Sequence, residues 1–183
     1  MTIKTVGIIG AGQMGNGIAH VVAQSGYDVL LHDLTEERVQ AALATINGNM
    51  ARQVSRGKLT EEERAAALGR IRYIPSHEGL GEADLVIEAA TEDEDVKRAI
   101  FTSVCPNLNE TCILASNTSS ISITRLAAAT DRPERFIGMH FMNPVPVMSL
   151  VELIRGIATD EPTVKAMRAL TEKLGKTAVS AED

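Results

Sequence analysis

The chain has 183 residues, of which 44% are hydrophobic and 23% are charged, a composition typical of globular proteins. A formal net charge of −6 and an aromatic content of 3% argue against a nucleic-acid-binding surface, and no apolar run is long enough to span a membrane. At this length we expect one domain over residues 1–183, and the lack of a signal-peptide pattern predicts a cytoplasmic protein.

A glycine-rich turn between a strand and a helix is the most informative feature. Apolar, β-branched residues predict a buried strand over Val6–Ile9, and helical spacing predicts a helix over Met14–Ala23. The turn has the pattern G-x-G-x-x-G, which brings backbone N–H groups close to a pyrophosphate at the start of the helix. The cofactor-binding residues expected here are Gly10, Gly12, Gln13, Met14 and Gly15.

An acidic residue follows the next predicted strand, Tyr27–His32. Asp33 lies about 20 residues beyond the first glycine, where this fingerprint places an acid. Its carboxylate can accept both hydroxyls of an adenosine ribose and would repel a 2′-phosphate, and Leu34 supplies no cation to offset that repulsion. We therefore expect NAD rather than NADP. The alternative is a glycine turn that serves only close packing, with Asp33 as a strand-end cap.

Two helices follow and are expected to project as an antiparallel pair. Thr35 can cap a long helix that ends near Gly57, and Thr60 with Glu63 forms a capping-box pattern for a helix that runs to about Gly69. Beyond them, strands and helices alternate. Strands are predicted at Ile71–Ile74, Asp84–Glu88 and Cys112–Ala115, with helices at Asp93–Ser103 and Ile121–Ala128.

The last third adds three further strands and one helix. Strands are predicted at Arg135–His140, Ser149–Leu153 and Thr177–Ser180, with a helix at Glu161–Leu174. Pro144 and Pro146 exclude a helix from the connector between the first two of these strands. The alternating order predicts an α/β fold with a mostly parallel, doubly wound sheet of the Rossmann type.

Candidate catalytic residues lie in two segments that begin at predicted strand ends, ASNTSS (115–120) and GMHFMNPVPVMSLVE (138–152). Ligands of doubly wound sheets bind beyond such ends. His140 can act as a general base and Glu152, on another strand, can orient its ring, while Ser119 and Asn143 offer donors to a substrate oxygen. These residue types suit reversible oxidation of a secondary alcohol. The alternative is a structural histidine at a strand end.

No metal site is expected. Cys105 and Cys112 have no partnering cluster, so we interpret them as reduced packing residues, and His20, His32 and His77 lack acidic or cysteine partners at metal-binding spacing.

The sequence resembles the L-3-hydroxyacyl-CoA dehydrogenase family, and most closely its short-chain 3-hydroxybutyryl-CoA dehydrogenases. The segments GAGQMG, ASNTSS and HFMNPVPVMSLVE carry the resemblance in that order, over essentially the whole chain. It implies NAD-dependent interconversion of (S)-3-hydroxyacyl-CoA and 3-ketoacyl-CoA, in fatty-acid or butanoate metabolism. In that family His140 and Glu152 match the base and its orienting partner, Ser119 and Asn143 match catalytic or ligand-contact positions, and Glu92 and Lys97 match NAD contacts.

The resemblance also implies that the projecting helices receive the nucleotide end of coenzyme A. Arg52, Arg56 and Lys58 place cations near Gly57, where a phosphorylated ligand can bind. The alternative is a solvated helix end whose cations complement the helix dipole.

Members of that family continue into a helical domain that forms a dimer and closes the substrate cleft, whereas these 183 residues end where that domain is expected. We therefore expect NAD binding with weak turnover from this chain, and homo-oligomers formed through the further domain. Two alternatives remain. One is a dehydrogenase of a free hydroxy acid or sugar acid that does not use coenzyme A. The other is a non-catalytic dinucleotide sensor, which needs the glycine turn and Asp33 but not His140.

Overall fold

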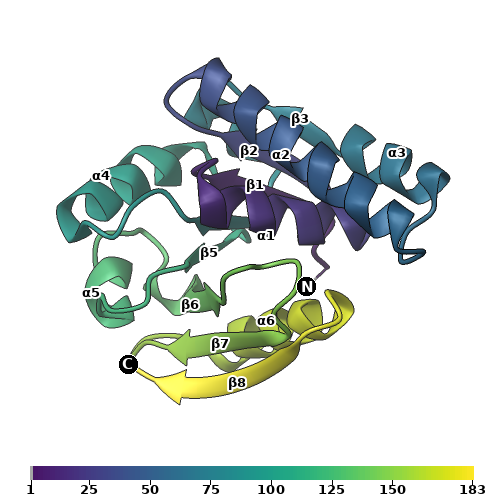
Figure 1. The fold of residues 1–183 in the computed structure, drawn as a ribbon. Coiled ribbons are helices and arrows are strands. Elements are labelled where there is room, and N and C mark those ends of the chain that lie inside the picture. Colours follow the sequence, from purple (N-terminus) through teal and green to yellow (C-terminus); the bar gives the residue numbers. More distant parts are fainter. Residues whose placement is uncertain (1) are drawn as a thin grey trace.

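A computed structural model describes residues 2–183 as one eight-stranded sheet with helices on both faces (Figure 1). The strands are β1 (Thr5–Ile9), β2 (Asp28–His32), β3 (Ile71–Tyr73), β4 (Leu85–Glu88), β5 (Ile113–Ser116), β6 (Phe136–Phe141), β7 (Leu150–Arg155) and β8 (Thr177–Glu182). Their order in the sheet is β3-β2-β1-β4-β5-β6-β7-β8. The first six are parallel, β7 is antiparallel to β6, and β8 is parallel to β7.

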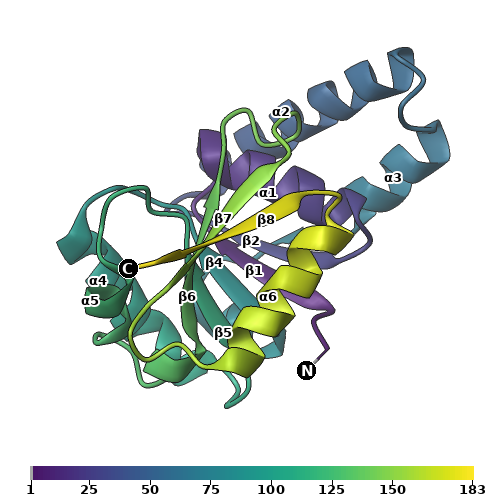
Figure 2. The same cartoon turned by 90° about the horizontal axis from the view of Figure 1, so that it is seen from below.

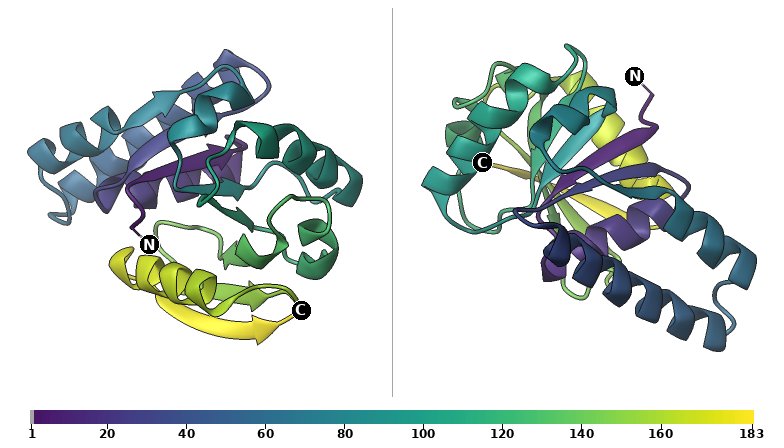
Figure 3. Two further views of the ribbon diagram at one scale, coloured as in Figure 1. Left: turned by 180° about the vertical axis from the view of Figure 1, so that it is seen from behind. Right: turned by 90° about the horizontal axis from the view of Figure 1, so that it is seen from above.

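Helices pack on both faces of the sheet (Figure 3). Each face has its own apolar core. The helices are α1 (Gln13–Gln24), α2 (Glu36–Ser55), α3 (Glu61–Gly69), α4 (Glu94–Val104), α5 (Ile123–Ala127) and α6 (Glu161–Lys173). One core joins the sheet to α1, α2, α3 and α6, through residues such as Ile18, Ile46 and Met167. The other joins it to α4 and α5, through Phe101 and Leu126. Within residues 2–183, none of these helices combines the length and apolarity needed to cross a membrane.

The projecting helical pair is confirmed, and α2 and α3 extend beyond the rest of the molecule (Figure 2). The side chain of Thr35 accepts a hydrogen bond from the Arg38 N–H at the start of α2. Gly57, at a φ of +72°, ends that helix in the left-handed conformation that favours glycine. Thr60 and Glu63 form both hydrogen bonds of the capping box.

The doubly wound, mostly parallel sheet is also confirmed, with every predicted strand and helix present within a few residues of its expected ends. The largest shifts have local causes. α5 begins at Ile123 because Ser122 is its N-cap, and β8 extends to Glu182 because it pairs along the whole of β7. The short 3₁₀ helix His77–Glu82 was not predicted.

Candidate active site

The glycines of the turn after β1 differ in their surroundings, because two of them are closely packed and one faces open space. Gly10 has a φ of +105°, and a Cβ at Gly15 would lie 1.8 Å from the Gly10 carbonyl oxygen, so neither position has room for a side chain. A Cβ at Gly12 would have no heavy atom within 4 Å. Because Gly12 is the N-cap of α1 and no side chain caps that helix, its first N–H groups remain available to an anion.

Asp33 is held between this turn and the start of α2. Its Oδ2 accepts a hydrogen bond from the Ala11 N–H at 2.8 Å, and its Oδ1 accepts one from the Leu34 N–H at 2.6 Å. Arg38 Nη1 lies 3.6 Å from the same Oδ1. Only Leu34 was considered as a source of charge beside Asp33, so Arg38, five residues further along the chain, was missed.

A cavity of about 650 Å³ opens where the loops after β1, β2 and β4 meet. The strand order reverses between β1 and β4, and such a switch point is where doubly wound sheets bind ligands. Its walls include the apolar side chains of Leu34, Val96 and Ile100, with Asp33 as the one carboxylate among the described lining residues. This combination suits an adenosine, whose base packs on apolar groups while its ribose meets the acid.

A buried ion pair supports the end of β4. The Lys97 ammonium donates to both oxygens of Glu88, at 2.7 and 2.9 Å. The Ser116 hydroxyl and the Ala90 N–H donate to the same carboxylate at 2.7 and 2.9 Å. Lys97 is only 1% exposed, so its position is beneath the surface and its expected contact with NAD stays a prediction. Glu88 was missed, although an acid at the end of a buried strand was a visible signal.

Glu92 ties the loop after β4 to the loop after β5. Its Oε1 accepts hydrogen bonds from the Thr118 hydroxyl, from the Ser119 N–H at 3.3 Å and from the Ser120 hydroxyl at 3.3 Å. Asn117 Oδ1 in turn accepts the Phe141 N–H at 2.8 Å, at the end of β6. The structure thus brings two of the predicted site residues, Glu92 and Ser119, together and ties the loop after β5 to the strand that carries His140.

His140 and Glu152 face each other across the antiparallel pair of β6 and β7. His140 Nδ1 lies 3.8 Å from Glu152 Oε1, and the two side chains are 22% and 39% exposed. Met139 and Phe141 point into the core beneath α1 and α6. Because side chains alternate along a strand, His140 points to the opposite face, on which α4 and α5 pack.

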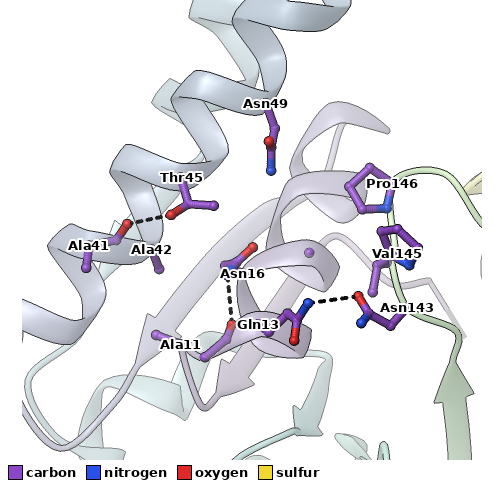
Figure 4. A pocket seen from close by; sticks show the side chains of 13 residues that line it. Ala11, Gln13, Asn16, Ala41, Ala42, Thr45, Asn49, Asn143, Val145 and Pro146 are labelled. Atoms are coloured by element: carbon purple, nitrogen blue, oxygen red, sulfur yellow. Dashed lines mark hydrogen bonds between the residues drawn. The ribbon is translucent and has the colours of Figure 1, made fainter.

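A second cavity, of about 380 Å³, lies between the start of α1, the side of α2 and the connector after β6 (Figure 4). Gln13 Nε2 donates to Asn143 Oδ1 at 3.3 Å on its floor, and Thr45 and Asn49 line its far wall. The residues shared with the first cavity are Ala11, Gly12 and Ala41. The glycine turn and Ala41 therefore form part of the wall of both cavities.

The predicted cations at the end of α2 lie outside both cavities. Arg52, Arg56 and Lys58 are exposed, and none of them lines either one. Arg52 nevertheless donates a hydrogen bond to the Asn49 side chain, which does line the second cavity. This contact connects the exposed basic end of α2 to the cavity wall.

The cysteines are buried, and desolvation by burial raises the pKa of the Cys112 thiol to about 12. Burial also raises the pKa of Cys105. Both thiols are therefore protonated at neutral pH, which makes them poor nucleophiles and metal ligands. Among residues 2–183, no cluster of three or more His, Cys, Asp or Glu side chains is arranged to hold a metal ion.

Comparison with known proteins gives close relatives. The chain is 60% identical to the 3-hydroxybutyryl-CoA dehydrogenase of Bradyrhizobium diazoefficiens over 181 residues, covering 99% of this chain and 62% of that protein. It is 47% identical to the probable 3-hydroxybutyryl-CoA dehydrogenase of Bacillus subtilis, covering all of this chain and 64% of that protein. The crystal structure of (S)-3-hydroxybutyryl-CoA dehydrogenase from Ralstonia eutropha superposes with a TM-score of 0.98 at 49% identity, covering all of this chain and 64% of that one.

The family expected from the three sequence motifs is confirmed. Residues 5–183 match the model of the 3-hydroxyacyl-CoA dehydrogenase NAD-binding domain. The chain spans under two thirds of the length of the relatives described above. It belongs to the 3-hydroxyacyl-CoA dehydrogenase family, within the part that binds NAD.

Proposed function

We propose that this chain binds NAD across the glycine turn and that His140 serves as the acid–base group for interconversion of 3-hydroxyacyl-CoA and 3-ketoacyl-CoA. The short-chain substrate 3-hydroxybutyryl-CoA is favoured, because the relatives are named for it. The observation that carries the proposal is the hydrogen bond from Gln13 to Asn143. It joins the turn expected to bind pyrophosphate to the loop that follows the histidine strand.

The residues present fit NAD. The open space at Gly12, the uncapped start of α1 and the carboxylate of Asp33 match a pyrophosphate and a ribose without a 2′-phosphate. The residues proposed to hold the cofactor are Gly10, Gly12, Gln13, Met14, Gly15, Asp33, Glu92, Lys97, Ser119 and Asn143. NAD, when bound, supplies the acceptor for a hydride from C3 of the substrate.

The protein's part is proton transfer and charge stabilisation. In the oxidation, His140 takes the proton of the 3-hydroxyl group, and in the reduction it returns that proton to the oxygen. Glu152 faces Nδ1 of the ring, which leaves Nε2 for the substrate. The amide oxygen of Asn143 accepts from Gln13, so its NH₂ group is free to donate, with the Ser119 hydroxyl, to the oxygen that becomes negative.

The second cavity gives a route for a long substrate. It runs from Asn143 to Asn49, and Arg52 links Asn49 to the basic end of α2, where Arg56 and Lys58 are also exposed. We propose that these three cations receive the phosphorylated end of coenzyme A, since basic side chains are the usual ligands of phosphate groups.

Two measurements on the 183-residue chain test the function. Titration with NADH, followed by fluorescence, should show binding. With the chain in excess over acetoacetyl-CoA, NADH should then be consumed slowly in a single turnover. We expect slow reaction because the His140 and Glu152 side chains are partly exposed, so the substrate is positioned from one side only. Binding of NADH without any consumption would favour a dinucleotide sensor.

The coenzyme A proposal has a separate test. Replacing Arg52, Arg56 and Lys58 together by Gln should weaken acetoacetyl-CoA binding and leave NADH binding unchanged. The matched control replaces the exposed lysines Lys4, Lys165 and Lys173 by Gln, which removes equal charge elsewhere. Equal binding by both triple variants would favour a substrate without coenzyme A.

Three further expectations stay predictions. They are the organisation of residues 1–183 as a single NAD-binding domain, homo-oligomer formation through a further helical domain, and a cytoplasmic location. Size measurements in solution and localisation of the tagged protein test the last two.

A further inference from the structure

We propose that Arg38 is a ligand for a 2′-phosphate and that repulsion by Asp33 outweighs its attraction, so that the preference for NAD over NADP depends on a single carboxylate. The inference rests on the proposed NAD site. It adds a specificity-determining residue to that site, and it predicts that NADP binding can be gained without introducing any new cation.

The geometry places a fixed anion beside an adjustable cation. Asp33 is pinned by the Ala11 and Leu34 N–H groups, and its side chain is 14% exposed. Arg38 Nη1 lies 3.6 Å from Asp33 Oδ1, which is too long for a hydrogen bond, and its side chain is 60% exposed. The guanidinium therefore lies close to the carboxylate without a hydrogen bond that fixes its position.

Both groups line the cavity of about 650 Å³ in which we place the adenosine. A ribose whose hydroxyls face Asp33 directs its 2′ substituent toward this pair. A 2′-phosphate there would be repelled by Asp33 and attracted by Arg38. The planar guanidinium can form two parallel hydrogen bonds to phosphate oxygens, so the sign of the net interaction depends on the charge at Asp33.

No other strong cation competes for this role. Arg38 is the single Lys or Arg among the described residues that line the cavity. Glu36 and Glu37 begin the same helix and are exposed, so they reduce the local positive potential and limit the affinity that Arg38 can supply. Removing Arg38 should consequently abolish any gain in NADP binding rather than lessen it.

The experiment compares NADH and NADPH binding, by fluorescence titration, in four forms of the 183-residue chain. They are the wild type, Asp33→Asn, Asp33→Asn with Arg38→Leu, and Asp33→Asn with Arg72→Leu. Asn retains an oxygen that can accept the Ala11 N–H, which protects the turn. Arg72 is the matched control, because it is 64% exposed and lies 3.4 Å from Glu82 in a similar surface pair away from the cavity.

We expect Asp33→Asn to raise NADPH affinity by about tenfold or more, which is about 1.4 kcal/mol, and to weaken NADH binding. Arg38→Leu should cancel the gain and Arg72→Leu should preserve it. An NADPH gain that survives the loss of Arg38 overturns the proposal. So does a folded Asp33→Asn chain that binds NADH and gains nothing for NADPH.

A single variant guards against misfolding of the Asp33 series. Arg38→Leu in the wild-type background should weaken NADPH binding, measured by competition with NADH, by a larger factor than it weakens NADH binding itself. Unchanged NADPH competition in this variant overturns the proposal. A wild-type chain that fails to bind NADH would instead contradict the proposed function on which the inference rests.

Discussion

Two carboxylates each lie beside a nitrogen-containing side chain, Glu88 of β4 beside Lys97 and Glu152 of β7 beside His140, and the two pairs differ in burial and in hydrogen bonding. Lys97 and Glu88 are 1% and 0% exposed, and the Glu88 carboxylate accepts four hydrogen bonds. His140 and Glu152 are 22% and 39% exposed and lie 3.8 Å apart. The first pair is saturated by the protein, whereas the second has hydrogen-bonding capacity left for a substrate.

The difference in burial predicts that the Lys97–Glu88 pair contributes to stability and the His140–Glu152 pair to the reaction. A buried pair is costly to break because one charge is left without a partner in a dry interior. A partly exposed pair is screened by water and contributes little to folding, yet its imidazole can reach a ligand. We expect substitutions at the end of β4 to affect unfolding and those at the β6–β7 edge to affect turnover.

The largest expected effect is on turnover at the open pair. His140→Ala should lower the single-turnover rate of acetoacetyl-CoA reduction by about 10²- to 10⁴-fold, because it removes the proton donor. NADH affinity and the midpoint of urea unfolding should change little. A rate within a few-fold of wild type would place the proton transfer elsewhere.

The saturated pair should show the opposite behaviour. Lys97→Met leaves the Glu88 carboxylate buried without its cation, and should lower the free energy of unfolding by about 3–5 kcal/mol. Arg72→Leu removes the cation of a surface pair with Glu82 and should cost about 0–1 kcal/mol. Adding Glu88→Gln to Lys97→Met should recover part of the loss in urea denaturation. Equal effects of the two cation deletions would contradict the contrast.

Two glycines of the turn after β1 allow a similar comparison, because Gly15 is closely packed and Gly12 faces open space. Gly15→Ala drives a Cβ against the Gly10 carbonyl and should destabilise the fold by about 1–3 kcal/mol. Gly12→Ala meets no protein atom and should leave stability unchanged, while NADH binding weakens by about tenfold, or about 1.4 kcal/mol. Thermal melts and NADH titrations separate the two outcomes. Unchanged NADH binding by a folded Gly12→Ala chain would show that the pyrophosphate does not bind close to Gly12.

The smallest expected effect concerns Asp183, an exposed carboxylate that still has three donors. Burial would raise its pKa, but hydrogen bonds from the Thr124 N–H, the Ser122 hydroxyl and the Ile123 N–H outweigh that cost and lower the pKa from 3.8 to about 2. Because the carboxyl has a lower pKa in the folded than in the unfolded chain, it stabilises the folded state at pH values above the unfolded-state pKa of 3.8. This contribution is lost as the pH falls through the folded-state pKa of about 2. Asp183→Asn should therefore lower the melting temperature slightly at pH 7, and the difference should shrink between pH 4 and pH 2. A difference in melting temperature that does not change with pH would show that the charge of Asp183 does not contribute to stability.

Much of the fold was predictable because its signals are local. The turn at Gly10, the caps at Thr35 and Thr60 and the apolar runs of the strands each depend on a few neighbouring residues, and the structure has them as expected. The pairing of His140 with Glu152 was different. The residue types indicated that Glu152 can orient His140, and the family resemblance implied the same pair, but spacing alone does not give the antiparallel register that sets the two opposite each other.

The features that were missed depend on contacts between side chains of different elements. Lys97 was expected to contact NAD, but Glu88 at the end of β4, which was not considered, gives it a buried partner. Arg38 was visible in the sequence, but only the structure shows its guanidinium 3.6 Å from the Asp33 carboxylate. The second cavity depends on Val145 packing over Gly17, where a Cβ would come within 2.8 Å of the valine. No short sequence pattern encodes such approaches.

The most direct test is whether hydride passes within this chain between a bound dinucleotide and a ligand beside His140. The chain in excess should be mixed with acetoacetyl-CoA and NADH that carries deuterium at C4, and the product examined by mass spectrometry. We expect 3-hydroxybutyryl-CoA with the deuterium at C3, formed slowly by the wild type and far more slowly by His140→Ala. NADH binding without labelled product from the wild type, or equal labelling by both forms, would contradict this expectation.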